Sequence, residues 1–376
     1  MYFMIAYLVI AVSCILITGR TLTSYNETAL WLKIGVYLIL TYAWFSPMIV
    51  WNLQASNTWP TWLYAVFAKF SYFLFGFAFL LVIALIGRDL LWQAAHFIVP
   101  QKVISPSNPA ALKCANYAVM AIIFICSLYA VYAAEKMPWV LHYGYADARI
   151  KRPLKLLVIS DLHITKMTSV QKVRRWVEYF NALKADMILM PGDIGDDRPA
   201  DIKEQISALK KLKAPLGIYY TIGNHESYFN ALAWEGEFAA LGWQVLHNSG
   251  VEAENTGLYI AGVPDSSTMS AHIAQAVQRA KPEDYRILLS HNPTTALNAQ
   301  KGEVDLQISG HTHGGQIFPF NWLTSWGNKG FVSGQYNLEN TTLLVSHGAG
   351  YWGPPMRLGA PSDILLISLN KSSPEH

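Results

Sequence analysis

Cysteine is scarce in this sequence of 376 residues, and so is charge. The three cysteines, Cys14, Cys114 and Cys126, all stand in apolar runs, and no Cys-x-x-Cys pair occurs. A disulfide framework and a thiolate metal site are therefore excluded, whereas the redox compartment stays undetermined. Charged residues make up only 14% of the chain, and the formal net charge is +3.

The few charges are unevenly distributed. Residues 1–134 hold six Lys/Arg and two Asp/Glu, whereas residues 135–376 hold 22 basic and 23 acidic residues. The excess positive charge thus belongs to an otherwise apolar front part, and the remainder is close to neutral. Because a nucleic-acid-binding domain normally carries a basic surplus, we expect no nucleic-acid partner.

Four apolar runs fill the front part, each close to the ~20 residues that a membrane-spanning helix needs. They cover about residues 2–19, 34–53, 63–87 and 114–134. Four such runs leave too little polar surface for a set of buried soluble helices. The first run lacks the basic start and the small-residue cleavage site of a signal peptide, so we expect an anchor. The prediction is an all-α transmembrane region over residues 1–134, in the cell (inner) membrane.

Loop charges predict the orientation of these helices. The first loop holds two basic residues and the third holds three, whereas the second loop, about residues 54–61, holds none. Basic loops stay on the cytoplasmic side, which places everything after the fourth helix outside. Four basic residues after that helix argue the other way, although large domains translocate with little regard to charge. We expect the rest of the chain on the extracytoplasmic side.

The sequence after the fourth run is predicted to form a linker over residues 135–152, with an edge strand at 139–145, and then a domain over residues 153–376. Short apolar runs typical of strands alternate there with helical patterns, which indicates a layered α/β domain. The strands are expected at residues 155–160, 187–190, 217–222, 244–246, 258–262, 285–290, 304–309, 342–345 and 364–369. The helices are expected at residues 170–184, 201–211, 229–241 and 270–280.

Several predicted strands run into a short cluster of Asp, Asn, His and Gly. The five clusters are DLH from Asp161, GDIGD from Gly192, GNHE from Gly223, HNP from His291 and GHTHGG from Gly310. Because ligands bind at the carboxyl edge of an open α/β sheet, we expect the clusters to converge. The converging donors would be Asp161, His163, Asp193, Asn224, His291, His311 and His313. Three oxygen donors and four imidazoles suffice for two divalent ions bridged by a carboxylate.

Each cluster taken alone has an ordinary structural explanation. An Asp after a strand is usually a helix N-cap, GNHE is a plausible turn, and a lone histidine such as His291 is more often part of a core. The joint occurrence of five clusters favours a site. Asp196 and Asp197 are interpreted as cleft-lining residues or as a solvated turn. Arg357 is interpreted as a phosphate-binding residue or as a surface salt bridge.

The GHTH segment is expected to be extended. Residues i and i+2 of an extended segment point to the same face, so His311 and His313 would enter the cleft while Thr312 turns away. The flanking glycines would permit the close backbone approach and the unusual φ angles that such a turn needs.

The five clusters, in this order and spacing, resemble the calcineurin-like metallophosphoesterase superfamily over about residues 153–369. The segments GHTHGGQIFP and GYWGPPMRLG are similar to its bacterial membrane-associated YkuE/YaeI-like branch. The resemblance implies an α/β sandwich of two β-sheets flanked by helices, and it does not cover the four-helix front. Glu226 departs from the Asp that many members carry after GNH, which is expected to affect loop shape and substrate choice but not the existence of the site.

The resemblance also implies roles for individual residues. Asp161, His163 and His313 would hold one metal ion, Asn224, His291 and His311 the other, and Asp193 would bridge the two. His225 would be the catalytic residue that contacts the phosphate and protonates the leaving oxygen, with a metal-bridging hydroxide as nucleophile. The cofactors would be two divalent metal ions, manganese first, with iron or zinc as alternatives.

The membrane region and this site together predict a membrane-embedded phosphohydrolase. Its substrate would be a phosphodiester or pyrophosphate bond of a lipid or envelope precursor, and its other partners membrane lipids. One alternative is a phosphomonoesterase or phosphoprotein phosphatase with the helices as a simple anchor. Another is an inactive sensor or scaffold, although such proteins usually lose ligands and here every one is present. The oligomeric state is not predicted.

Overall fold

The computed structural model describes residues 2–24, 28–56 and 58–372, so residue 1 and residues 373–376 of the two predicted domains lie outside the described part. The chain forms two compact units. The helical unit consists of residues 1–133 together with Gly353–Met356, and the α/β unit of Ala134–Trp352 together with the residues from Arg357 onward.

Four long helices form the described part of the helical unit. They are α1 (Tyr2–Thr23), α2 (Leu30–Ser56), α3 (Thr61–Ile98) and α4 (Pro109–Glu135). All four are long and apolar enough to cross a membrane, as the sequence predicts. Each is longer than its predicted run. In α3 the charged pair Arg88 and Asp89 does not interrupt the helix, which ends only before Pro100 because proline disfavours helical backbone in the preceding residue.

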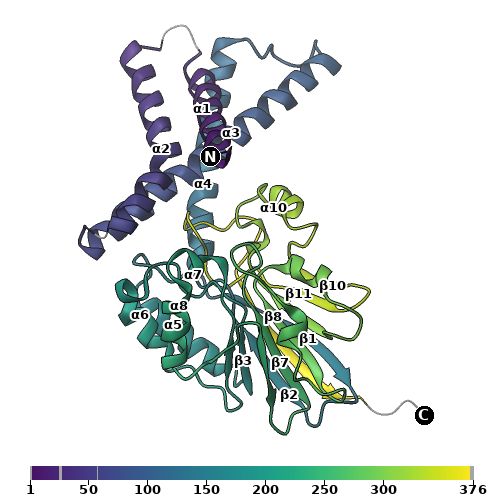
Figure 1. Ribbon diagram of the computed structural model, residues 1–376. Helices are drawn as coiled ribbons and strands as arrows, with labels where there is room; N and C mark the ends of the chain where they lie inside the picture. Colours follow the sequence, from purple (N-terminus) through teal and green to yellow (C-terminus); the bar gives the residue numbers. More distant parts are fainter. Residues whose placement is uncertain (1, 25–27, 57, 373–376) are drawn as a thin grey trace. The chain divides into compact units, whose positions relative to one another are not determined.

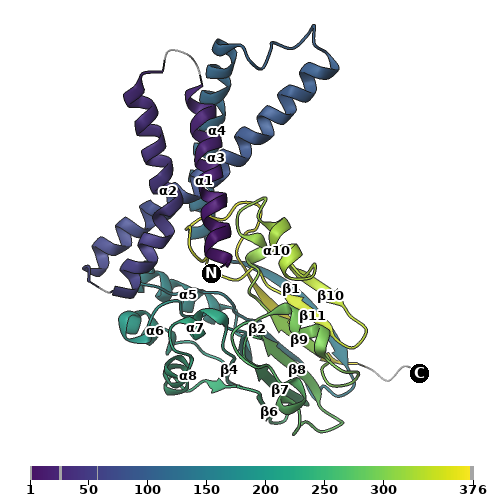
Figure 2. The same ribbon diagram turned by 45° about the horizontal axis from the view of Figure 1, so that its top comes forward.

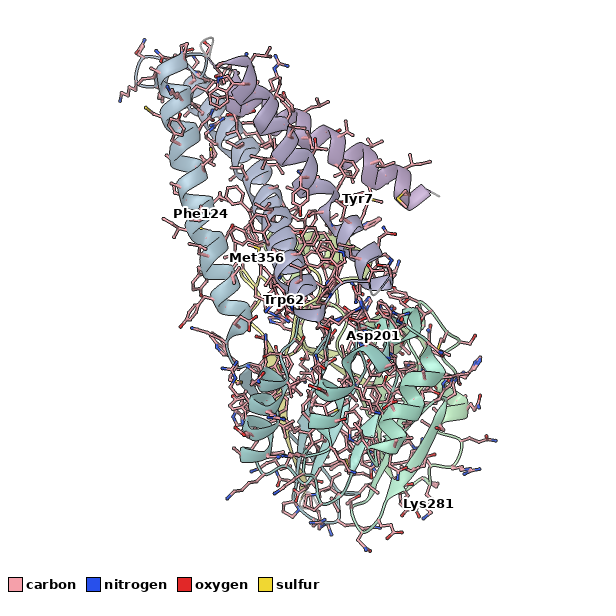
Figure 3. All side chains as sticks on the ribbon, turned by 90° about the vertical axis from the view of Figure 1, so that its left-hand side faces the viewer. Tyr7, Trp62, Phe124, Asp201, Lys281 and Met356 are labelled. Carbon is pink, nitrogen blue, oxygen red and sulfur yellow. The ribbon has the colours of Figure 1, made fainter. Side chains whose placement is uncertain are left out.

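The first three helices pack around one apolar cluster that includes Ala11, Trp44 and Val82. Met356 also belongs to this unit and is fully buried there, among the side chains drawn in Figure 3. It lies so close to Gly76 of α3 that a side chain at position 76 would collide with its sulfur. A short segment from late in the sequence is therefore part of the packing of the helical unit.

Twelve strands of the described chain form two six-stranded sheets. The first sheet has the order β1 (Trp139–Asp147), β12 (Asp363–Lys371), β2 (Leu154–Val158), β3 (Met187–Met190), β4 (Ile218–Tyr220), β5 (Gln244–Val245). The second has the order β10 (Gly334–Asn337), β11 (Thr342–Val345), β9 (Leu306–Ser309), β8 (Tyr285–Ser290), β7 (Leu258–Val263), β6 (Ser249–Ala253), as Figure 2 shows.

The two sheets pack face to face and are covered by helices on their outer faces. Leu156 and Leu189 of the first sheet share one buried cluster with Ile260 and Ile308 of the second. The first sheet is covered by α5 (Val170–Ala182), α6 (Lys203–Leu209) and α8 (Ala231–Ala240), seen together in Figure 1. The second is covered by α9 (Ile273–Ala276). The predicted α/β sandwich is confirmed.

All nine predicted strands are present, but two further strands are not predicted. These are β6 and β10, the two edges of the second sheet. Their sequences, SGVEA and GQYN, contain no apolar run because much of each strand faces solvent. The helix expected at 270–280 shortens to α9, and the one expected at 229–241 begins only after Asn230, which caps α8 with a φ of 79°.

The segment expected as a linker carries regular structure. β1 pairs in parallel with β12 along its whole length, from Trp139 opposite Asp363 to Asp147 opposite Lys371. Only residues 136–138 separate α4 from this strand. The remaining short elements are α7 (Asn224–Tyr228), α10 (Asn321–Gly327) and 3-10 turns at Pro199–Ile202, Pro293–Asn298 and His313–Gly315.

Candidate metal centre

Strand direction brings the five clusters together. β2, β3 and β4 are parallel neighbours, and so are β7, β8 and β9. The clusters that follow β2, β3, β4, β8 and β9 therefore emerge at carboxyl ends of strands, where ligands bind in such sheets. The predicted ligands are buried except for His311, which is half-buried.

The predicted extended conformation of GHTH is wrong. β9 ends at Ser309, and the chain then turns, with φ of 73° at His311 and 50° at His313 and helical angles at Thr312. The N–H of Thr312 donates to the carbonyl of Gly310, which an extended segment would not allow. Two left-handed residues on either side of Thr312 bring in the two imidazoles, so the unusual φ angles fall on the histidines themselves as well as on Gly314 and Gly315.

Left-handed backbone is common to most of the predicted ligands. It occurs at Asp161, His163, Asp193, His311 and His313, with φ between 44° and 73°. For residues with a Cβ this conformation costs about 1 kcal/mol each. Strain of this kind persists where the surrounding structure enforces it, and it gathers at functional sites.

The first predicted ligand set has the spacing of donors around one ion. Nε2 of His163 and Nε2 of His313 lie 3.0 Å apart, and Nε2 of His313 lies 3.3 Å from Oδ1 of Asp161. Two donors that bind one ion at about 2.1 Å lie about 3.0–3.4 Å apart for octahedral or tetrahedral angles. The third distance, from Nε2 of His163 to Oδ1 of Asp161, is 3.8 Å, and all three donor atoms lie within 4.8 Å of one another, close enough to hold a single divalent ion.

The second set lies on the other side of Asp193. Oδ2 of Asp193 is 3.0 Å from Nε2 of His291 and 3.6 Å from Nε2 of His163, so this carboxylate faces both sets. Nδ1 of His311 is 3.0 Å from Oδ1 of Asn224. Within the described residues Nε2 of His291 is buried and makes no hydrogen bond of normal geometry, although Oδ2 of Asp193 lies 3.0 Å away. An unpartnered buried nitrogen beside a carboxylate fits a second divalent ion.

In His163 and His291, the ring nitrogen Nδ1 lies beside an oxygen acceptor, and this contact determines which ring nitrogen carries the proton. Nδ1 of His163 lies 3.2 Å from Oδ2 of Asp196, and Nδ1 of His291 lies 2.8 Å from the carbonyl oxygen of Pro191. An N–H at Nδ1 that donates to these oxygens leaves Nε2 unprotonated, which is the form that binds a metal.

Asp196 and Asp197 are not a solvated turn, since both side chains are buried. Oδ1 of Asp196 lies 2.7 Å from Nδ1 of His225, so one carboxylate contacts both His163 and His225. Burial alone would lower the pKa of His225, but the carboxylates of Asp196 and Asp193 outweigh burial and raise that pKa. Asp197 instead pairs with Lys166 at 3.7 Å. The spacing of the acids in GDIGD is the signal that could have found Asp196.

Glu226 does more than shape a loop. Its Oε2 accepts hydrogen bonds from the backbone N–H of Asp193 and of Gly223, at 3.0 and 2.9 Å. Its Oε1 accepts from Ile194 and Gly195, at 2.5 and 3.0 Å. One fully buried carboxylate therefore fixes the GDIGD loop to the GNHE turn.

Arg357 is neither a surface salt bridge nor an exposed phosphate-binding residue, because only 1% of it is exposed. Its guanidinium lies 3.1 Å from Nδ1 of His313. It also donates hydrogen bonds to four backbone carbonyls in the segment of residues 347–360, those of His347, Gly348, Gly350 and Ala360. Burial lowers the pKa of Arg357 to about 10, so the side chain stays charged at neutral pH and ties the GHTH turn to that segment.

Known proteins share this sequence pattern. The family described as calcineurin-like phosphoesterase matches residues 154–315. An uncharacterised metallophosphoesterase of Campylobacter jejuni is 34% identical over 258 residues, which cover 66% of this chain and 68% of that protein. A transmembrane protein with metallophosphoesterase domain of Bos taurus is 32% identical over 235 residues, 57% of this chain and 53% of that protein.

The uncharacterised metallophosphoesterase YkuE of Bacillus subtilis is 29% identical over 232 residues, which cover 58% of this chain and 80% of that protein. This chain thus spans only about half the length of the Bos taurus relative and about two thirds of the Campylobacter one. All five strand-end clusters, from Asp161 to Gly315, lie within the region that the family description matches. By these matches the chain belongs to the calcineurin-like metallophosphoesterase family.

Proposed function

We propose that this chain is a membrane-anchored phosphohydrolase that cleaves a phosphodiester or pyrophosphate bond of a lipid or envelope precursor. The observation that carries the proposal is the double donor set that meets at Asp193, with His225 beside it. An inactive sensor or scaffold has no need for a complete set of buried donors. Manganese is the first choice for the two metal ions, with iron or zinc as alternatives.

Two divalent ions bound at these sets would supply a nucleophile at neutral pH and neutralise charge on the phosphoryl group. The chain's own residues orient the reaction. Nδ1 of His225 is paired with Asp196, which leaves Nε2 to donate a proton to the leaving oxygen. The Asp196 carboxylate stabilises the charged imidazolium that carries this proton.

Apolar side chains near His225 support a lipid substrate. The ring of Trp352 lies 6.1 Å from the ring of His225, and 46% of Trp352 is exposed. Hydrogen bonds between Gln316 and the Trp352 backbone tie this residue to the segment that follows GHTHGG. An apolar group leaving from the phosphate would meet an aromatic surface beside the proton donor.

The segment of α10 adds a second apolar surface. Trp322, Leu323 and Trp326 are 67%, 60% and 84% exposed. No charged residue stands between His313 and Lys329. Uncharged segments rich in tryptophan favour the interface between a bilayer and water, and large exposed apolar patches mark interaction sites. We infer that the α/β unit works at a membrane surface, on the extracytoplasmic side that the loop charges favour.

The proposal is tested with the full chain purified in detergent. Metal is stripped with a chelator, and Mn²⁺ is added back with a soluble diester, a soluble monoester and a lipid pyrophosphate as substrates. We expect no turnover without metal, and recovery with Mn²⁺ on diester or pyrophosphate bonds. Activity that survives complete metal removal would contradict the mechanism, and a preference for the monoester would favour the phosphomonoesterase alternative. Protease accessibility of the α/β unit in intact cells tests the side of the membrane.

A further inference from the structure

A sixth polar cluster follows a strand of the second sheet. β7 ends at Val263, and Pro264, Asp265 and Ser266 come next. Asp265 is fully buried, and its backbone N–H donates to the carbonyl of Ile222 at 3.1 Å, just before the GNHE turn. An Asp after a strand commonly accepts hydrogen bonds from the next few residues and so begins a turn.

Only one oxygen of Asp265 is used in that turn. Oδ1 accepts hydrogen bonds from the backbone N–H of Ser267, at 2.7 Å, and from its hydroxyl. Oδ2 is buried and has no hydrogen-bond partner among the described residues. The donor atoms of Asp265, His291 and His311 lie within 4.8 Å of one another. Ser267 therefore holds in place a carboxylate that belongs to the cluster of the second ligand set, and the turn leaves Oδ2 of that carboxylate unused.

Among the residues that the structure describes, two buried atoms of this cluster lack a hydrogen-bond partner, Oδ2 of Asp265 and Nε2 of His291. In the neutral form of His291, which is the form that binds a metal, they cannot satisfy each other, because Nδ1 donates its proton to the carbonyl of Pro191 and Nε2 carries only a lone pair. Burying such groups unpaired is costly. A cation that both atoms bind removes the cost for both.

We infer that Asp265 is a ligand of the second metal ion, together with Asn224, His291 and His311. The inference rests on the dinuclear site of the proposed function. Without Asp265 the second set offers two neutral imidazoles, one neutral amide and a share of Asp193. With it, each ion has one carboxylate of its own, Asp161 or Asp265, and shares Asp193.

The added carboxylate also bears on metal choice. Carboxylate oxygens suit Mn²⁺ and Mg²⁺, whereas imidazoles suit Zn²⁺ and other late transition metals. Asp265 therefore shifts the second site toward Mn²⁺. The first site offers two imidazole nitrogens and two carboxylate oxygens, from Asp161 and the shared Asp193, whereas the second site with Asp265 offers two imidazole nitrogens and three oxygens.

The test measures metal binding by the full chain in detergent, without any substrate. Metal-free protein is titrated with Mn²⁺, and free Mn²⁺ is followed by electron paramagnetic resonance. Wild type should bind two equivalents. Asp265→Asn should bind the first equivalent normally and the second about tenfold or more weaker. Asp284→Asn is the matched control, since Asp284 is also a buried Asp, stands before β8 at the opposite strand end, and accepts from the N–H of Lys281.

Two further measurements separate a ligand from a structural residue. Ser267→Ala keeps the carboxylate but removes one of its two hydrogen-bond donors, so it should weaken the second equivalent less than Asp265→Asn does. Thermal unfolding without metal should show Asp265→Asn at least as stable as wild type, because the substitution removes a buried unpaired charge. The inference would be overturned if Asp265→Asn bound two equivalents of Mn²⁺ with wild-type dissociation constants, whether or not its metal-free stability were lower.

These outcomes are independent of turnover. A wild type that binds two Mn²⁺ ions, the second through Asp265, but hydrolyses no phosphate ester would contradict the proposed function and leave the ligand assignment standing. If wild type hydrolyses phosphate esters but Asp265→Asn binds both Mn²⁺ ions normally, the proposed function stands and the assignment of Asp265 as a ligand is contradicted. Competition with Zn²⁺ adds a second readout, because Asp265→Asn should move the preference of the weaker site from Mn²⁺ toward Zn²⁺.

Discussion

Oδ1 of Asp196 lies 2.7 Å from Nδ1 of His225, so a buried carboxylate orients the residue that we propose as proton donor. Replacing Asp196 by Asn keeps the size of the side chain but removes its charge. We expect kcat to fall about 10²-fold, within the range that general acid catalysis contributes. The measurement is kcat at saturating Mn²⁺, with metal content in parallel because Asp196 also contacts His163. An unchanged kcat would show that the carboxylate does not support catalysis.

His225→Ala should lower turnover strongly while both metal ions stay bound, because His225 belongs to neither predicted ligand set. The loss should be largest for a poor leaving group such as an alcohol, which needs a proton, and small for p-nitrophenol, which leaves as an anion. Rates for a series of leaving groups and metal content per chain check this. Equal losses across the series, or loss of metal, would mean that the role of His225 is different.

His311→Ala and His313→Ala should each weaken one metal ion first. His311 contacts Asn224 of the second set, whereas His313 contacts His163 and Asp161 of the first. Mn²⁺ titration of each variant should show one equivalent bound with nearly wild-type affinity and the other much weaker. The double variant should lose both. Loss of both ions in each single variant would contradict separate ligand sets.

Glu226→Gln should destabilise the α/β unit. A Gln side chain has one acceptor oxygen, whereas the Glu226 carboxylate accepts four backbone hydrogen bonds. A buried backbone N–H that loses its acceptor costs about 1–3 kcal/mol in the free energy of unfolding. Thermal unfolding in detergent measures the effect, with Glu178→Gln on the exposed face of α5 as the control. Equal stability of the two variants would contradict the conclusion that Glu226 fixes the GDIGD loop to the GNHE turn.

Replacing both Trp322 and Trp326 by Ser should separate soluble from membrane-bound substrates. The two residues lie outside the ligand sets, so hydrolysis of a soluble diester should stay unchanged. Hydrolysis of a lipid substrate in vesicles should fall several-fold in kcat/KM if α10 meets the bilayer. The control replaces Leu232 and Leu297, two other exposed apolar residues, by Ala. A parallel fall on both substrates would indicate misfolding instead.

The sequence is most informative where local pattern and tertiary structure coincide. Apolar runs predict the four long helices, and every buried strand follows from its own residues. Edge strands β6 and β10 escape prediction because a half-exposed strand has no apolar run. The GHTH turn is not predicted either, because the alternation of side chains along a strand does not indicate the residue at which the strand ends.

Partners far apart in the sequence explain the rest. Asp196, Glu226 and Arg357 each look ordinary alone, and their roles appear only when the loop or turn that they bind is in place. Arg357, for example, contacts His313, 44 residues earlier in the chain. Asp265 has a local explanation in its turn with Ser267, which hides the oxygen that the turn does not use.

The metal centre lowers the stability of its own fold, because five of its residues have left-handed backbone: Asp161, His163, Asp193, His311 and His313. Glycine adopts these conformations more readily than any of the residues present. A library of variants selected for folding alone, without metal, should therefore drift toward glycine at these five positions. A library selected for hydrolysis should retain Asp and His there, and the contrast between the two would reveal which side chains the reaction requires.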